Sequence, residues 1–233
     1  MQAAANVGDK SLLVIIPAYN EGSRIEPVIA AALEHLPVVV IDDGSSDNTP
    51  QVAGQAGAHV VHQQPNQGKG AALKAGFNYA IQQDYRAVIT LDADGQHDPA
   101  EIPKFVEAFQ NGHTDLVIGA RDFKEMPPVR RLANWLGKRS LSWAMGETIL
   151  DNQSGYRLIG RRLMQDMLAI QQEGFEFEVE MIVACVQRGY DLEWVKIRTI
   201  YGGESSHINP VKHLTGYVGL VYRTRQSVRK STS

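Results

Sequence analysis

The first half of the chain alternates short, continuous apolar runs with segments whose apolar residues recur at helical spacing. A continuous apolar run is typical of a strand buried on both faces of a sheet. Strands that alternate with helices predict a single α/β domain with a mostly parallel, doubly wound central sheet flanked by helices. The predicted strands cover residues 12–16, 38–41, 58–62, 87–91 and 116–119, and the predicted helices cover about 23–35, 69–83 and 99–110.

Acidic and polar residues follow three of these predicted strands. The clusters are Pro-Ala-Tyr-Asn-Glu at 17–21, Asp-Asp-Gly-Ser at 42–45 and Asp-Ala-Asp at 92–94. Ligands of open parallel sheets bind beyond the carboxyl ends of the strands, so clusters that are distant in sequence meet at one edge. The alternative is that each cluster is an independent loop whose acids cap a following helix. We expect the clusters to converge on one binding site.

Asp92 and Asp94 stand one residue apart directly after an apolar strand. Two carboxylates this close repel each other unless a cation or a hydrogen-bond donor lies between them. An oxygen-rich pocket suits a hard divalent metal such as Mg²⁺ or Mn²⁺, which typically holds a diphosphate. An ordinary acidic turn is the alternative, because Asp-Gly and Asp-Pro both favour turns.

Composition argues against several other classes of protein. The net charge of −3 gives no reason to expect nucleic-acid binding. The lone cysteine, Cys185, excludes an internal disulfide framework and lies in an apolar run that predicts a buried thiol. The first ten residues lack the apolar core of a signal peptide, and no apolar run is long enough to span a membrane. We therefore expect a cytoplasmic protein whose attachment to the cytoplasmic membrane, if any, is peripheral.

The glycine-rich loops of two common nucleotide-binding classes are missing. No Gly-x-Gly-x-x-Gly follows the first predicted strand, and Gly68-Lys69-Gly70 lacks the hydroxyl residue that follows the lysine of a P-loop. A nucleotide would therefore be held by other means than in a Rossmann dehydrogenase or a P-loop enzyme.

Five motifs, taken in this order along the chain, resemble glycosyltransferase family 2, whose fold is the Rossmann-like GT-A domain. The nearest branch is the dolichyl- or polyprenyl-phosphate sugar transferases. The resemblance implies a GT-A domain over residues 10–210, followed by a C-terminal amphipathic helix and basic tail over 211–233. The motifs are residues 17–21, 42–45, 66–70 (Asn-Gln-Gly-Lys-Gly), 92–97 (Asp-Ala-Asp-Gly-Gln-His) and 119–121 (Gly-Ala-Arg).

The resemblance also implies roles for individual residues on the donor side. It assigns Asp94 as a direct ligand of Mg²⁺ or Mn²⁺, and Gln96 completes the metal shell. It places Arg121 near the diphosphate or the incoming phosphate. The residues implied to bind the nucleotide-sugar, from the base and ribose to the sugar, are Pro17, Tyr19, Glu21, Ile41, Asp43, Lys69, Asp92, Ala93 and His207.

Residues 151–157 (Asp-Asn-Gln-Ser-Gly-Tyr-Arg) resemble a family motif on the floor of the acceptor side. The alternative is a turn that leads into a strand at 156–159. The candidate catalytic residues are Asp94, Arg121, Asp151 and Arg157, and Asp151 is a candidate general base for a hydroxyl acceptor. Arg130 and Arg131 begin a predicted helix over about 129–145, where they would meet a lipid phosphate or form a basic solvated face.

The last third of the chain offers further candidates. A helix beginning near Glu178 would place Glu178 or Glu180 near the acceptor, or simply supply acids to its first turn. Gly-Gly-Glu-Ser-Ser-His at 202–207 suits a mobile loop that closes over the donor. Some relatives carry a lysine where His207 stands, so protonated His207, Arg198 or Lys212 would serve the diphosphate. The predicted helix at 210–223 either packs on the core or docks on an anionic membrane.

These features predict a metal-dependent, inverting transfer of a sugar from a GDP- or UDP-sugar to a polyprenyl or dolichyl phosphate. A phosphate monoester is largely ionised near pH 7, so such an acceptor needs positive charges more than it needs a general base. The alternative within the family is transfer to a glycan or another hydroxyl acceptor. A nucleotidyltransferase and a non-enzymatic binding module are the rivals outside it.

Overall fold

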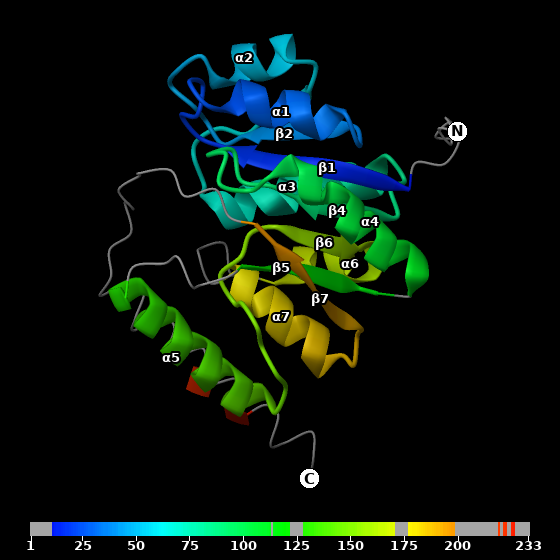
Figure 1. Cartoon of the computed structure of the whole chain (residues 1–233). Coiled ribbons are helices and arrows are strands. Elements are labelled where there is room, and N and C mark those ends of the chain that lie inside the picture. Colours follow the sequence, from blue (N-terminus) through cyan, green and yellow to red (C-terminus); the bar gives the residue numbers. More distant parts are fainter. Residues whose placement is uncertain are drawn as a thin grey trace.

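The computed structural model describes residues 11–112, 114–121, 128–170 and 177–198, with the backbone alone at 128–134, and helical residues 219, 221–222 and 225–226. A seven-stranded sheet lies between two layers of helices (Figure 1). The strands are β1 (Leu12–Ala18), β2 (Val38–Asp42), β3 (His59–His62), β4 (Ala87–Thr90), β5 (Leu116–Arg121), β6 (Arg157–Gly160) and β7 (Leu192–Ile197). The helices are α1 (Ile25–Leu33), α2 (Thr49–Gln55), α3 (Lys69–Gln82), the 3-10 turn η1 (Pro99–Glu101), α4 (Ile102–Asn111), α5 (Pro128–Met145), α6 (Arg161–Ala169) and α7 (Phe177–Gln187).

The strand order is β3-β2-β1-β4-β6-β5-β7. Every pair of neighbours is parallel except the two that β6 forms, with β4 and with β5. The prediction of a mostly parallel sheet is therefore confirmed. β6 runs the other way because the segment before it, which contains Gly155, already lies at the edge where β4 ends, so the chain enters β6 from that edge.

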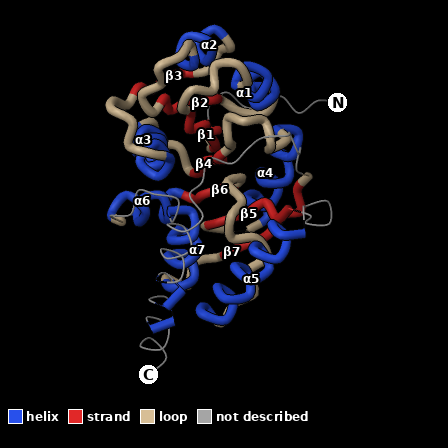
Figure 2. Tube along the Cα trace, turned by 90° about the vertical axis from the view of Figure 1, so that its left-hand side faces the viewer, coloured by secondary structure: helices blue, strands red, loops and turns tan. Residues whose placement is uncertain are grey.

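The core explains why the strand sequences are continuously apolar. Along β1, Leu13 and Ile15 belong to one core cluster, whereas Val14 and Ile16 belong to the other. Successive residues of a strand point to opposite faces, so a strand buried on both faces needs apolar residues throughout. Figure 2 shows α3, α6 and α7 along one face of the sheet and α1 and α4 along the other.

One glycine sets how closely a helix approaches the sheet. A Cβ added at Gly76 of α3 would lie 2.7 Å from Cγ2 of Ile15 in β1. Any larger residue would therefore push α3 away from the central strand. Because α3 begins with Lys69, this close contact also fixes where the Lys69 side chain starts relative to the carboxyl end of β1.

The predicted strands and helices within residues 11–198 are present with shifts of one or two residues. The predicted helix at 210–223 lies largely outside the described residues, and its packing remains a prediction. Two local features differ from expectation. The helix α6 was not predicted, although its buried Leu163, Met164 and Met167 have helical spacing. The acidic turn after β2 does not cap α2, because Asp42 accepts from the amide of Ser45 instead. The predicted strand at 156–159 corresponds to β6, and the helix predicted from Glu178 begins at Phe177.

None of the helices within the described residues is both long and apolar enough to cross a membrane.

Cys185 lies near the C-terminal end of α7, fully buried in the core, as predicted. Burial raises the pKa of its thiol to about 12, with a smaller contribution from Asp115. A thiol in this state presents almost no thiolate to a reagent near pH 8. We expect the folded protein to resist a thiol-reactive dye and the protein unfolded in guanidinium to take up one dye per chain. Rapid labelling of the folded protein would contradict this burial.

Candidate active site

The three strand-end clusters meet at one cavity of about 380 Å³, as the sequence predicted. The cavity lies beyond the carboxyl ends of β1, β2 and β4, where parallel strands are expected to present a ligand site. The residues that line it are Pro17, Ala18, Tyr19, Glu21, Asp43, Asn66, Gly68, Lys69, Ala72, Asp92, Ala93 and Asp94. Ile41 was also expected at this site, but it is fully buried in the core and does not line the cavity.

Asp43 organises one wall of the cavity. Its Oδ1 accepts hydrogen bonds from the amide of Gln67 at 2.9 Å and from Nε2 of Gln63 at 2.9 Å. Its Oδ2 accepts from the amide of Gly68 at 2.7 Å. Because Gly68 directly precedes α3, this carboxylate fixes the loop that delivers Lys69 to the cavity.

Lys69 connects the donor side of the cavity to α7. Its Nζ lies 2.5 Å from Oδ1 of Asp92 and 3.0 Å from Oε1 of Glu178. We call these three residues the Lys69–Asp92–Glu178 triad. Sequence reasoning named each residue, but it did not predict that Lys69 would join the other two.

Electrostatics within the triad favour its charged form. Burial alone would raise the pKa of Asp92, but the positive charge of Lys69, with a smaller contribution from Arg121, outweighs burial and lowers that pKa to about 2. Burial would lower the pKa of Lys69, and the two carboxylates reverse this and raise it. Both groups therefore remain charged at neutral pH.

His97 supports the turn that carries the two aspartates, a role that sequence reasoning missed. Its buried imidazole accepts a hydrogen bond at Nδ1 from the amide of Asp92 at 3.2 Å. An imidazole that accepts at Nδ1 is neutral, and burial correspondingly lowers the pKa of His97. The ring also packs against Tyr156, with centroids 5.2 Å apart. The sequence offered a sign of this role, because a histidine that follows an Asp-x-Asp turn can accept a hydrogen bond from the backbone of that turn.

Asp94 and Glu21 bring two carboxylates to the same cavity. Oδ1 of Asp94 accepts a hydrogen bond from the amide of Gln96 at 2.9 Å, which orients the carboxylate. Burial raises the pKa of Glu21, Arg24 opposes this shift, and the negative charge of Asp94 adds to it. The cavity therefore concentrates negative charge beside Asp94, which favours a cation there.

Arg121 and Asp151, both predicted to be catalytic, form a bidentate pair. Nε of Arg121 lies 2.7 Å from Oδ2 of Asp151, and the second guanidinium nitrogen lies 3.0 Å from Oδ1. Asp151 also accepts from the amides of Gln153 and Ser154, which shapes the motif that the sequence singled out. Both oxygens of this carboxylate accept hydrogen bonds, so Asp151 is better suited to orienting Arg121 than to acting as a general base.

Arg157, at the start of β6, is almost completely buried. Its Nε donates to the carbonyl of Ser154 at 2.7 Å, and another nitrogen donates to the carbonyl of Glu178. Arg157 therefore joins the segment at 151–157 to the start of α7. It does not line the cavity, so its predicted catalytic role is not supported by direct access to the site.

The sequence model of glycosyl transferase family 2 matches residues 13–168. The chain belongs to glycosyltransferase family 2. This transferase is 30% identical over 206 residues to the polyprenol monophosphomannose synthase of Mycolicibacterium smegmatis, covering 79% of this chain and 76% of the relative. It is 33% identical over 192 residues to the dolichyl-phosphate hexose transferase of Haloferax volcanii, covering 80% of this chain and 81% of the relative.

The fold of the transferase is shared with solved GT-A glycosyltransferases. The glucosyl-3-phosphoglycerate synthase of Mycobacterium tuberculosis, solved with Mn²⁺, uridine diphosphate and phosphoglyceric acid, superposes with a TM-score of 0.71. The sequences are 22% identical, and the superposition covers 94% of this chain and 78% of that one. At this identity the likeness shows the fold, which is the one predicted.

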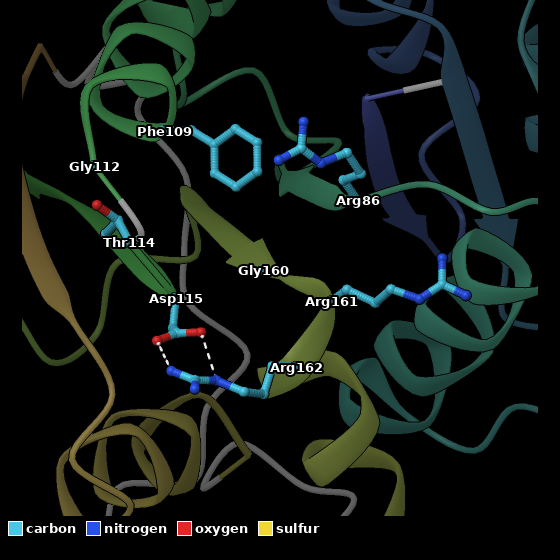
Figure 3. Close-up of a pocket in the computed structure, with 8 residues that line it drawn as sticks. All are labelled: Arg86, Phe109, Gly112, Thr114, Asp115, Gly160, Arg161 and Arg162. Carbon is cyan, nitrogen blue, oxygen red and sulfur yellow. Dashed lines mark hydrogen bonds and ion pairs between the residues drawn. The ribbon is translucent and has the colours of Figure 1, made fainter. Parts of the chain in front are cut away.

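A second cavity of the transferase, of about 450 Å³, lies at the opposite edge of the sheet (Figure 3). This cavity is slightly larger than the one that contains Asp94, but most of the charged side chains that line it are engaged in ion pairs within the protein. Arg162 forms a two-point pair with Asp115, and Arg161 pairs with Asp84 while its side chain points away from Phe109. The amino ends of β4 and β5 surround this cavity, so the strand-end clusters do not reach it. The cavity with Asp94 is therefore the candidate active site.

Gly155 allows the backbone to pass beside the triad. A Cβ at this position would lie 2.9 Å from one side-chain atom of each triad member. We expect Gly155→Ala to leave the transferase folded, because flexible side-chain ends can move, but to slow transfer by about tenfold to a hundredfold, since small misplacements of site groups are costly.

The matched control is Gly54→Ala in α2, where an added Cβ meets nothing within 4 Å. Alanine there should raise the free energy of unfolding by about 0.5–1 kcal/mol and leave the rate unchanged. Equal rates for the two variants in a radiolabelled transfer assay would contradict the importance of this close approach.

Several predicted residues lie outside the described part of the structure. His207 and Lys212 lie in residues 199–218, and the side chains of Arg130 and Arg131 lie in residues 128–134. Their roles remain predictions, as does the loop proposed to close over the donor.

Proposed function

We propose that this transferase moves a sugar from a nucleotide-sugar to a polyprenyl or dolichyl phosphate, with inversion at the anomeric carbon. The observation that carries the proposal is the convergence of three strand-end clusters on one cavity with Asp94 in its wall. The relatives at 30% and 33% identity, named a polyprenol monophosphomannose synthase and a dolichyl-phosphate hexose transferase, support the acceptor class.

On the donor side, the cavity offers the groups that a nucleotide-sugar requires. Tyr19 is about half exposed at its rim, so its ring can pack on a base. Glu21 and Asp92 offer carboxylates that can accept hydrogen bonds from a base, a ribose or a sugar hydroxyl. Lys69 offers an ammonium to the diphosphate, and a diphosphate would compete with Asp92 and Glu178 for it.

The residues that the structure describes supply too few ligands for a divalent metal by themselves, so the phosphates of the substrate would have to complete the coordination. No group of three or more His, Cys, Asp or Glu side chains in the described part of the chain could hold a metal by itself. Mg²⁺ in nucleotide sites commonly binds one or two carboxylates plus substrate phosphates. Asp94 lines the cavity and would supply such a carboxylate, whereas the predicted ligand Gln96 does not line it and contacts Asp94 through its backbone amide. When bound, a metal would stabilise the negative charge that grows on the departing nucleoside diphosphate.

On the acceptor side, the reaction needs charge and orientation more than a base. An oxygen of the lipid phosphate attacks the anomeric carbon, the bond from that carbon to the diphosphate oxygen breaks, and no proton has to move. Arg121 is held by Asp151 and is close enough to Asp92 to lower its pKa. We assign Arg121 to the phosphate groups, with Asp151 and Arg157 as positioning residues.

Two measurements test the proposal. A thermal-unfolding screen of GDP- and UDP-sugars with Mn²⁺ should find one nucleotide that raises the melting temperature, because binding to the native state alone stabilises it. The stabilising nucleotide-sugar is then incubated with polyprenyl phosphate or with glycan acceptors. Transfer to the lipid phosphate with release of the nucleoside diphosphate is expected. Transfer to a hydroxyl acceptor alone would establish the alternative family 2 reaction.

A further inference from the structure

The large exposed apolar side chains of the described residues are concentrated around α5. Trp135 is 51% exposed, Leu136 is 54% exposed and Trp143 is 60% exposed. Leu150, shortly after the helix, and Tyr222, in the C-terminal helical residues, are also exposed. Monomeric soluble proteins rarely leave neighbouring tryptophans in water without a binding partner for them. This concentration therefore marks an interaction surface.

Helix α5 is apolar on two sides. Leu141, Ala144 and Met145 are buried against the protein. Each residue turns an α-helix by about 100°, so Leu136 and Trp143 lie about 20° apart around the axis and Trp135 lies about 80° from Trp143. The three exposed side chains therefore share one face of α5, and the buried residues lie on the other side of the helix. We call this exposed face, which includes Leu136, the tryptophan face of α5.

Basic residues accompany the tryptophan face. The guanidinium of Arg139 lies 5.9 Å from the ring of Trp135, and that of Arg225 lies 4.9 Å from the ring of Trp143. The helix sequence contains four basic residues and no acidic residue. Figure 1 shows α5 at the lower edge of the molecule, where a flat partner could reach it. Exposed indoles with flanking arginines suit the interface of a membrane whose lipids are anionic.

A second copy of the chain is a poorer partner for the same face. A twofold dimer would bring the same surface patch of both copies together. Arg139 and Arg225 of each copy would then lie at the interface, and the sequence of α5 offers no acidic residue to pair with them. Like charges at an interface oppose association. An anionic lipid surface removes that repulsion and accepts the indoles at headgroup depth.

We propose that the tryptophan face of α5 docks this transferase on an anionic membrane surface. Trp135, Leu136 and Trp143 enter the interfacial layer, and Arg139 and Arg225 contact lipid phosphates from its edge. The proposal extends the proposed function by naming the surface from which a lipid acceptor would be taken. It does not depend on which nucleotide or sugar the site uses.

Tryptophan fluorescence tests the docking directly. The chain has three tryptophans, so Trp194→Phe leaves the two of the tryptophan face as the only indole reporters. Vesicles of phosphatidylglycerol and phosphatidylcholine should shift the emission of this variant to shorter wavelength, and brominated lipids should quench it. Vesicles of phosphatidylcholine alone should give a much weaker effect. Unchanged emission on the anionic vesicles would overturn the proposal.

Vesicle co-sedimentation provides the second readout. In the full chain, Trp135→Gln with Trp143→Gln should weaken binding to the anionic vesicles by at least about tenfold, because two indoles no longer enter the interface. The matched control is Leu33→Gln, which changes an exposed apolar residue on α1 and should bind normally. Normal binding by the double variant would overturn the proposal.

Activity separates this inference from the proposed function. The double variant should transfer sugar normally to a short-chain, water-soluble polyprenyl phosphate and slowly to a long-chain one in vesicles. Failure of the unmodified protein to use either acceptor, with vesicle binding intact, would reject the proposed function alone. A dimer detected by light scattering and lost in the double variant would instead assign the face to a second copy and reject membrane docking.

Discussion

Asp94→Asn will lower the rate of sugar transfer by on the order of 10³-fold or more, because a metal on this carboxylate would supply several kcal/mol of charge stabilisation. The side chain keeps its shape, and its oxygen can still accept from the amide of Gln96, so the turn should persist. The variant should also lose the Mn²⁺-dependent part of its thermal stabilisation by the nucleotide-sugar. Transfer rates and melting temperatures with and without Mn²⁺ measure the two effects.

Asp98→Asn is the matched control for this substitution. Asp98 belongs to the same loop, but its Oδ1 accepts from the amide of Ala100 and so caps η1. Asparagine caps helices as well as aspartate does, so the stability should be almost unchanged. The control should retain transfer and the Mn²⁺ effect. Full activity in Asp94→Asn would remove Asp94 from the metal site and with it the main argument for the proposed donor chemistry.

Lys69→Met will impair both stability and transfer. It removes the ammonium between Asp92 and Glu178 and leaves two carboxylates facing each other, one of them buried. We expect the free energy of unfolding at pH 7 to fall by about 1–2 kcal/mol, less than for a fully buried pair, since Lys69 is 38% exposed. Transfer should fall by about 10²-fold, as when one preorganised donor is removed from a reacting anion.

The pH dependence of stability gives the same substitution a distinct signature. In the unmodified protein the folded-state pKa of Asp92 is about 2, below the value of about 3.9 expected when unfolded. The stabilisation by Asp92 is therefore complete above pH 4 and is lost as the pH falls through 2. Lys69→Met should remove much of this acid-sensitive part, which urea unfolding between pH 2 and 5 would measure.

Lys74→Met is the matched control on the same helix. The ammonium of Lys74 donates to the carbonyl of Ile170 and lies over the ring of Phe177. It should not change the acid dependence attributed to Asp92. If both lysine variants titrate alike, the triad does not set the charge of Asp92.

The fold was largely predictable because its signals are local. The apolar runs that form β1, β2 and β4 are buried on both faces, and a strand buried in this way requires apolar residues at nearly every position. Helix α6 was not predicted, although its apolar residues have helical spacing. It is short and begins with two arginines, which weakens the apolar pattern. The antiparallel direction of β6 could not be read from its four residues, because direction depends on where the preceding segment lies.

The candidate site divides in the same way. The sequence alone determined that the polar clusters after β1, β2 and β4 reach the carboxyl edge of the sheet. Strands that alternate with helices run parallel, so the residues that follow each strand lie at the same edge. Tertiary structure alone decided that Lys69 bridges Asp92 and Glu178, that Asp151 holds Arg121, and that the tryptophans of α5 face outward. Each of these depends on contacts between segments far apart in the chain, and no local pattern specifies such contacts.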